Sequence, residues 1–330
     1  MKVLLTGGTG FVGAHVLRLL LQQGQEVVAL QRNASRKDLV ADVVDKVQWI
    51  EGDVTDISSL ETAFDGIDKV VHCAAVVSFH PKDRRRMMQI NVDGTANMVN
   101  FALDAGVQQF VHVSSIAAIG RSATQRHLSE ASKWETSAHN SQYAISKYLA
   151  EQEVWRAGAE GLPVSIVNPS MVLGSGFWGE NTSIFFKRID DGLHFCPTGA
   201  SGFVDVKDVA TFIWKLLETG NTGERFLLNG ENIAYKTLFG WIAKELEVPP
   251  PSISAAPWMA EVAWRIEWLR EKLTGSIPLV TKESARSSVN SFTFDNRKSL
   301  AAFPDFRYTP IRETVMDAAK EYRRKFPKTR

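Results

Sequence analysis

Two residues that can carry acid–base chemistry lie four positions apart in this sequence. Tyr143 and Lys147 occur in the segment Tyr-Ala-Ile-Ser-Lys, within residues 141–157, which we predict to form a helix. Residues four apart share one face of a helix, so the phenol and the ammonium should lie side by side. A phenol ionises at about pH 10, and a neighbouring ammonium lowers that pKa towards the range useful for catalysis. The alternative is an ordinary surface pair, because this spacing is common.

A hydroxyl group is expected near this pair. Ser114 and Ser115 follow an apolar segment, residues 109–113, that is predicted to be a strand. In a parallel sheet, ligands bind outside the carboxyl ends of the strands. A serine there can donate a hydrogen bond to a substrate carbonyl oxygen, or it can merely satisfy the backbone of a turn. Serine, tyrosine and lysine together are much more specific than any one of them.

The segment Thr6–Gly13, Thr-Gly-Gly-Thr-Gly-Phe-Val-Gly, predicts a binding site for phosphate groups. It follows a short apolar strand, residues 2–5, and opens a stretch with helical spacing. Gly7 allows a tight turn, Gly10 lets the backbone approach a pyrophosphate, and Gly13 lets the helix pack closely on the strand. The N-terminus of the helix presents free N–H groups and partial positive charge to the anion. A glycine-rich turn that binds nothing is the alternative.

The elements that would position these groups alternate between strand and helix. Continuously apolar runs indicate strands buried on both faces of a parallel sheet, at residues 26–31, 47–51, 69–74, 109–113 and 163–167. Helical patterns separate them, at residues 35–44, 56–64, 85–105 and 141–157. Such units, joined by right-handed crossovers, predict an α/β fold with a Rossmann-type doubly wound parallel sheet.

Beyond residue 168 the alternation fades, and glycine, proline and tryptophan become frequent. We predict a dinucleotide-binding domain of residues 1–170, to which residues 203–230 return as a helix and a strand. Residues 171–202 and 231–330 would form a smaller substrate-binding lobe, which includes an amphipathic helix at residues 258–273.

Composition excludes some functions. The 330 residues include 38 basic and 37 acidic side chains, and this balance gives no reason to expect nucleic acid or a membrane as partner. The two cysteines, Cys73 and Cys196, indicate no disulfide framework and favour a reducing cytoplasm. No metal-ligand spacing occurs among the histidines, so no metal is expected, and His72 and His112 are predicted to be satisfied core groups.

The chain resembles the extended short-chain dehydrogenase/reductase family, which includes nucleotide-sugar epimerases, dihydroflavonol reductases and 3β-hydroxysteroid dehydrogenases. The resemblance covers nearly the whole chain. Its motifs, in order, are Thr6–Gly13, Gly52–Asp56, His72–Ala75, Asn91–Thr95, Ser114-Ser115, Tyr143–Lys147 and Phe203–Ala210.

The resemblance implies Tyr143 as general acid/base and Lys147 as the group that lowers its pKa and holds the nicotinamide ribose. Ser115, in preference to Ser114, would polarise the substrate carbonyl. Other residues would line the cofactor: Gly7, Thr9, Gly10, Phe11, Val12, Gly13, Asp53, Val54, Ala74, Ala75, Asn91, Ser114, Pro169 and Val172. Asn168 departs from the family pattern, in which Arg often precedes the proline. A homodimer through the helices at residues 85–105 and 141–157 is a further family expectation.

The end of the second strand bears on the choice between NAD and NADP. NAD-binding proteins place an acidic residue there to hold the ribose hydroxyls. Here the strand ends in Gln31-Arg32, with Arg36 and Lys37 close behind. No carboxylate repels a phosphate, and Arg32 can bind one through two parallel hydrogen bonds. We therefore predict a preference for NADP(H), with NAD(H) as the alternative.

The residues after Ser115 bear on the reaction. Family members that dehydrate sugar nucleotides carry an acidic pair there, whereas this chain has Ile116–Ile119, so dehydration is disfavoured. An apolar pocket suits a steroid-like or aromatic ketone, and four residues are predicted to line it: Val77, Ser78, Phe79 and Trp178. We predict an oxidoreductase that reduces a ketone, or oxidises the alcohol, of a small and largely apolar substrate, most similar to the dihydroflavonol reductase-like and 3β-hydroxysteroid dehydrogenase-like branch. A nucleotide-sugar epimerase with NAD is the alternative, followed by a non-catalytic NADP-binding regulator.

Overall fold

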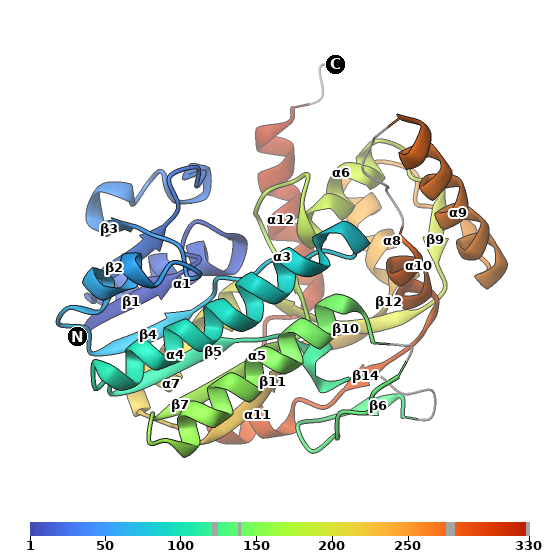
Figure 1. Cartoon of the computed structure of the whole chain (residues 1–330). Helices are drawn as coiled ribbons and strands as arrows, with labels where there is room; N and C mark the ends of the chain where they lie inside the picture. The colour runs from blue at the N-terminus through green and yellow to red at the C-terminus, as the bar shows by residue number, and fades with distance from the viewer. Residues whose placement is uncertain (121–124, 138–139, 275–280, 328–330) are drawn as a thin grey trace.

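A seven-stranded parallel sheet forms the centre of the computed structural model, which describes residues 1–120, 125–137, 140–274 and 281–327 (Figure 1). The strand order is β11-β7-β5-β4-β1-β2-β3. The order reverses between β1 and β4, which is the switch point where doubly wound sheets bind ligands. The predicted Rossmann-type fold is confirmed. The strands are β1 (Lys2–Thr6), β2 (Glu26–Gln31), β3 (Gln48–Glu51), β4 (Lys69–His72), β5 (Gln109–Val113), β7 (Val164–Pro169) and β11 (Glu224–Leu228).

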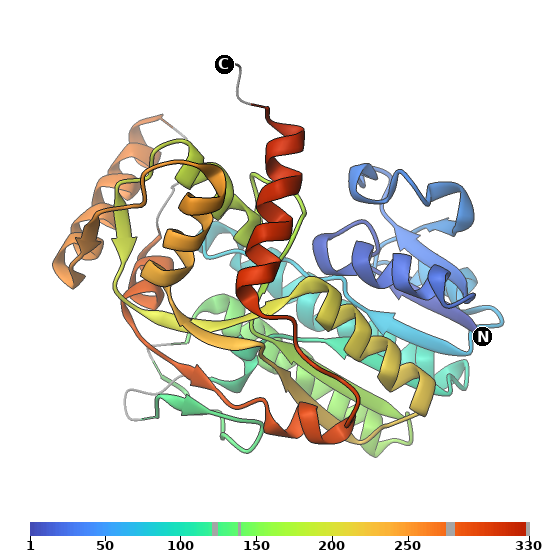
Figure 2. The ribbon, with the colours of Figure 1, turned by 180° about the vertical axis from the view of Figure 1, so that it is seen from behind.

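Helices cover both faces of this sheet (Figures 1 and 2). Two helices, α1 (Phe11–Gln22) and α7 (Val206–Thr219), pack on one face, and α4 (Gly94–Asp104) and α5 (Gln142–Ala159) pack on the other. Successive strand residues point to opposite faces, so Val3 and Leu5 join the first core while Leu4 joins the second. This double burial explains the continuously apolar strands.

Two predicted helices differ in the structure. Residues 35–44 form no α-helix but two short 3₁₀ turns, η1 (Asp38–Val40) and η2 (Val44–Lys46). Val40 is the one residue of these turns that is buried, and Leu39 and Val43 pack only partly on the core, so the segment buries little apolar surface with which to stabilise a longer helix. The predicted helix at residues 85–105 is interrupted: α3 (Arg84–Met88) and α4 flank a π-helical turn, η5 (Gln89–Asp93).

The smaller lobe has its own sheet and core. Its three strands are β8 (Met171–Leu173), β10 (Ala200–Asp205) and β12 (Glu231–Ala234). Three helices enclose its core: α6 (Ile184–Asp190), α8 (Tyr235–Leu246) and α12 (Ile311–Lys325). Since β10 belongs to this sheet while α7 and β11 belong to the large one, the chain passes from one unit to the other within residues 200–228.

Shorter elements complete the described fold. Two small sheets pair β9 (Phe195–Pro197) with β13 (Ile253–Ala255) and β6 (His127–Leu128) with β14 (Thr293–Phe294). The remaining helices are α2 (Ile57–Leu60), η3 (Glu61–Phe64), η4 (Pro81–Asp83), η6 (Ile116–Ile119), η7 (Asn181–Ser183), α9 (Pro257–Thr274), α10 (Lys282–Val289) and α11 (Arg297–Ala302). The predicted amphipathic helix is α9. Within the described ranges, no helix combines the length and apolar character needed to cross a membrane.

Candidate active site

Three glycines shape the loop between β1 and α1. Gly7 has a φ of 68°, and a Cβ there would lie 2.7 Å from the Ala74 nitrogen. A Cβ on Gly13 would lie 2.1 Å from the Gly7 carbonyl oxygen, which already accepts a hydrogen bond from the Gly10 nitrogen at 2.9 Å. Helix α1 begins at Phe11 with no side-chain cap and no acidic residue in its first turn. The loop therefore fits the phosphates of a dinucleotide, since the helix N-terminus is left to interact with an anion. Thr9 and Val12 belong to the same turn.

The other predicted cofactor residues follow the neighbouring strands. Asp53 and Val54 follow β3, and the Asp53 carboxylate accepts hydrogen bonds from Thr55. Ala74 and Ala75 follow β4, and the Ala74 nitrogen donates to the Thr6 hydroxyl at 3.2 Å. Pro169 ends β7, and Val172 lies in β8. Of these residues, Ala74 and Ala75 follow a strand that flanks the switch point, while the others follow β3 or lie in β7 and β8.

Near the end of β2, two arginines differ in whether the described residues hold their guanidinium groups. The Gln31 Oε1 atom is buried and has no hydrogen-bond partner among the described residues. Arg36 pairs with Glu180 at 2.8 Å and lies over the Phe177 ring at 4.0 Å. Arg32 is exposed. Within the described part of the chain, no ion pair or aromatic ring holds its guanidinium as Glu180 and Phe177 hold that of Arg36. Arg32, rather than Arg36, is therefore available to bind a phosphate here.

Tyr143 and Ser115 lie together. The Ser115 hydroxyl accepts a hydrogen bond from the Ala117 nitrogen at 3.1 Å as the N-cap of η6, and it lies near the Tyr143 phenol, with which it interacts. The Phe79 ring lies edge-on to the Tyr143 ring, with centroids 6.1 Å apart. Burial raises the pKa of the Tyr143 phenol, and the interaction with Ser115 lowers it. Ser115 therefore has both the local backbone role and a position beside the phenol.

Lys147 is buried on α5, one turn after Tyr143. Its side chain is 1% exposed, and Nζ donates to the Val113 carbonyl at 2.9 Å and lies 3.4 Å from His112 Nε2. Burial lowers the pKa of Lys147 to about 8. The prediction that the pKa of Tyr143 is lowered is wrong for this structure. The pKa is raised, because the effect of burial is larger than the opposing effect of Ser115.

Ser114 faces away from Tyr143 and towards a residue that the sequence analysis missed. Its hydroxyl donates to Glu151 Oε1 at 2.5 Å, and both side chains are buried. Glu151 also pairs with Arg225 at 3.2 Å. The signal for Glu151 was its spacing, because positions 143, 147 and 151 share one face of α5. No comparable signal marked Arg225, which lies far away in the sequence.

Asn91 holds the segment after β4 against α5. Its amide accepts a hydrogen bond from the Val76 nitrogen at 2.7 Å and donates to the Val76 oxygen and the Ser146 hydroxyl, each at 2.9 Å. The π-helical turn η5 carries Asn91 into this buried position. Two residues of the segment that Asn91 anchors are exposed. Val77 follows Val76 directly, and the Phe79 ring lies beside the Tyr143 ring.

The remaining predicted substrate residues have structural partners. Ser78 donates to Asp83 at 2.6 Å. Trp178, predicted to line the substrate pocket, is a core residue of the smaller lobe. It is 6% exposed, and its ring lies edge-on to Phe186 and Tyr322 at 5.5 and 5.2 Å. This packing explains the burial of Trp178 without a role in ligand binding.

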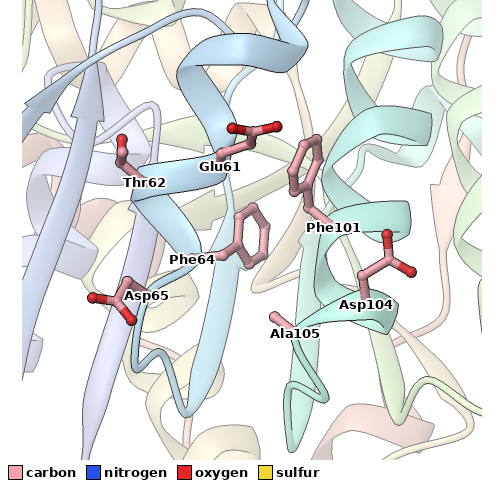
Figure 3. Close-up of a pocket in the computed structure, with 7 residues that line it drawn as sticks. All are labelled: Glu61, Thr62, Phe64, Asp65, Phe101, Asp104 and Ala105. Carbon is pink, nitrogen blue, oxygen red and sulfur yellow. The ribbon is translucent and has the colours of Figure 1, made fainter.

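Two hollows in the structure do not involve the Ser-Tyr-Lys group. One, of about 960 Å³, lies between α1 and α12 and is bordered by Trp178. The other, of about 510 Å³, lies between η3 and α4, where the Phe64 and Phe101 rings stack at 5.7 Å (Figure 3). Neither hollow is lined by Tyr143 or Ser115.

The histidines of β4 and β5 are buried. His72 hydrogen-bonds to Thr6 at 2.7 Å and to Thr95 at 3.1 Å, and burial lowers its pKa to about 3. This confirms it as a satisfied core group. His112 was predicted to be the same, but its Nδ1 lacks a partner among the described residues. In the ranges that the structure covers, no cluster of His, Cys, Asp or Glu could hold a metal ion.

Comparisons with known proteins agree with this arrangement. Residues 3–228 match the model of the NAD dependent epimerase/dehydratase family. The chain is 31% identical to a Synechocystis protein named "Putative dihydroflavonol 4-reductase", over 95% of this chain and 92% of that one. It is 32% identical to sterol demethylase protein B of Methylococcus capsulatus, over 78% of each chain.

Among solved structures, that of gox2253 is similar over 100% of this chain and 99% of its own, with a TM-score of 0.83 and 30% identity. WbmH of Bordetella bronchiseptica, solved with NAD⁺, has the same fold, with a TM-score of 0.77 and 24% identity over 98% of each chain. The chain is an NAD(P)-dependent enzyme of the extended short-chain dehydrogenase/reductase type. The chain belongs to the NAD-dependent epimerase/dehydratase family.

Proposed function

We propose that this protein transfers hydride between NADP(H) and a ketone, or the corresponding alcohol, on a small and largely apolar substrate. The observation that carries the proposal is that the Ser115 hydroxyl lies near the Tyr143 phenol, with Lys147 on the same helix one turn further on. The similarity to proteins named for a dihydroflavonol and a sterol supports an apolar ring system as substrate.

Ser115, Tyr143 and Lys147 have distinct roles in the proposed reaction. When bound, the dinucleotide supplies or accepts a hydride at the carbonyl carbon. Tyr143 gives a proton to the carbonyl oxygen during reduction, and Ser115 donates a hydrogen bond to the same oxygen. Burial keeps the phenol protonated, because it raises the pKa of Tyr143, and this favours the role of acid. The Lys147 ammonium stabilises the phenolate that remains and returns a proton to it.

The proposed substrate position is beside Tyr143, where the exposed Phe79 ring meets the phenol. Val77 is 54% exposed on the same segment. These apolar side chains would contact the ring system of the substrate while its carbonyl points to Ser115.

Replacement of Tyr143 by Phe tests the function. We expect turnover of a ketone panel with NADPH to fall at least about 100-fold, because the proton donor is removed, while NADPH affinity changes little. Tyr148→Phe is the matched control, since Tyr148 lies on the same helix and packs its ring on Trp134 at 4.3 Å. Normal turnover by Tyr143→Phe would remove the phenol from the mechanism. Tight NADPH binding by a wild-type protein that reduces no member of the panel would favour a non-catalytic regulator.

The preference for NADP rests on Arg32. We expect Arg32→Asp to weaken NADPH binding at least about tenfold more than NADH binding, because a bidentate contact to the 2′-phosphate is replaced by repulsion. Arg36→Ala is the control: its guanidinium is held by Glu180, so both cofactors should be affected slightly and equally. Equal losses in Arg32→Asp would refute the assignment. Purified protein that carries NAD and works without added cofactor would instead indicate an epimerase.

A further inference from the structure

Glu151 carries a buried negative charge for which the proposed chemistry has no use. Its carboxylate is 0% exposed, one turn beyond Lys147 on α5. Oε1 accepts hydrogen bonds from Ser114 and from the Asn168 amide, both at 2.5 Å, and Oε2 pairs with Arg225 at 3.2 Å. Burying a carboxylate is costly unless its oxygens are paired, and here donors from three strands, β5, β7 and β11, converge on one group.

These contacts link Glu151 to the serine that faces the phenol. The Asn168 amide that bonds to Glu151 also donates to the Ser115 carbonyl at 2.9 Å. Ser114, the preceding residue, bonds to the same carboxylate oxygen. The main chain at the end of β5 is therefore held from two sides. Arg225 is itself fixed, because its guanidinium donates to the Glu130 carbonyl at 2.6 Å.

The charge of Glu151 also acts on Lys147. The groups that face Lys147 come from three elements: Glu151 on α5, His112 on β5, and His72 and Cys73 beside β4. Burial lowers the pKa of Lys147 to about 8, and Glu151 opposes this shift more than Cys73 does. Burial keeps both histidines neutral, with pKa values well below the ordinary value, and burial raises the pKa of Cys73 to about 12. At neutral pH, Glu151 is thus the charged group among these that favours the ammonium.

We propose that Glu151 is a positioning residue of the active site: its charge keeps the buried Lys147 protonated, and its Oε1 atom, through Ser114 and Asn168, holds the end of β5 so that Ser115 faces Tyr143. This inference rests on the proposed function, which assigns Lys147 and Ser115 their roles. Glu151 touches neither substrate nor the reacting atoms, and it acts through the residues that do.

Two substitutions with opposite effects on charge test the inference. Glu151→Gln removes the negative charge and leaves the buried Lys147 and the partly buried Arg225 without this counter-charge. We expect the ionisation of Lys147, seen as a limb in the pH profile of kcat/KM, to move to lower pH by about one unit or more. Arg225→Met keeps the carboxylate and removes a competing cation, so the same limb should move to higher pH. Each variant loses a contact of the network. If Glu151 had only a structural role, kcat/KM would change in both variants, but the Lys147 limb of the pH profile would not move in opposite directions.

A matched control lies on the same helix. Glu153 forms a surface pair with Arg156 at 2.9 Å, so Glu153→Gln changes the net charge of the protein as Glu151→Gln does. We expect its pH profile to coincide with that of the wild type, because this partly exposed charge is screened by solvent.

A second readout does not depend on catalysis. The ¹³Cε resonance of Lys147, assigned as the signal absent from Lys147→Met, can be titrated in uniformly lysine-labelled protein. We expect its midpoint to move down in Glu151→Gln and up in Arg225→Met. If no substrate is turned over, the proposed function fails while this titration still decides the role of Glu151. If Glu151→Gln does not fold, the Arg225→Met shift decides alone. Unmoved or equally directed midpoints would overturn the inference.

Discussion

Replacement of Gly13 by Ala is the sharpest test of the phosphate-binding loop. The added Cβ would lie 2.1 Å from the Gly7 oxygen and 2.7 Å from the Gly7 carbonyl carbon, and real Cβ atoms essentially never approach closer than 3.0 Å. The loop or the helix must therefore move by about 0.9 Å. Both partners are backbone, so no side chain can rotate to relieve the contact. Overpacking of this kind costs about 1–3 kcal/mol.

The same displacement would disturb the cofactor site. The Gly7 oxygen accepts the hydrogen bond from Gly10 that closes the turn, at 2.9 Å. Moving it alters the position of the backbone N–H groups at the start of α1, which the phosphates are expected to contact. If the strain raises the free energy of the NADPH complex relative to the free protein by about 1–3 kcal/mol, NADPH affinity falls about 5- to 150-fold.

Gly240→Ala is the matched control, because Gly240 also lies within a helix, α8, and a Cβ there would meet no heavy atom within 4 Å. We expect it to stabilise the protein by about 0.5–1 kcal/mol and to leave cofactor binding unchanged. NADPH titration by fluorescence and urea unfolding measure the two effects. Wild-type NADPH affinity in a folded Gly13→Ala protein would refute the assignment of the loop to the phosphates.

Two further predictions concern the cores. Trp178→Ala should reduce the free energy of unfolding by about 3–5 kcal/mol without changing KM, because its ring packs on Phe186 and Tyr322; a higher KM with unchanged stability would contradict this. His72 ionises at about pH 6.5 in the unfolded chain and at about 3 in the folded one, so its contribution to stability is complete above pH 6.5 and is lost as the pH falls towards 3. From pH 7 to pH 5 the wild type should lose about 2 kcal/mol more than His72→Gln, which cannot titrate, and equal losses in urea unfolding would exclude this linkage.

The sequence pattern of a single segment was sufficient to predict those elements whose structure depends on that segment alone. The central strands were predictable because both of their faces are buried. The glycine loop was predictable because steric limits exclude a side chain at Gly7 and Gly13 and leave little room for one at Gly10. Residues 35–44 show where such signals fail. Helical spacing indicates a possible apolar face but not whether the fold supplies a surface to cover it, and there only Val40 of the two turns is buried.

The polar network under the site could not be predicted in the same way, because its members meet only when the sheet has formed. Glu151 bonds to residues 17 positions later, 37 earlier and 74 later, on three different strands. Besides the spacing of Glu151 on α5, a local clue was Asn168, which stands where arginine is frequent in the family. The structure gives this departure a physical reason. An amide can donate to both Glu151 and the Ser115 carbonyl, and the guanidinium on Glu151 comes from Arg225 on β11 instead. Asn168 and Arg225 should therefore be coupled, so that the loss from replacing both is smaller than the sum of the single losses.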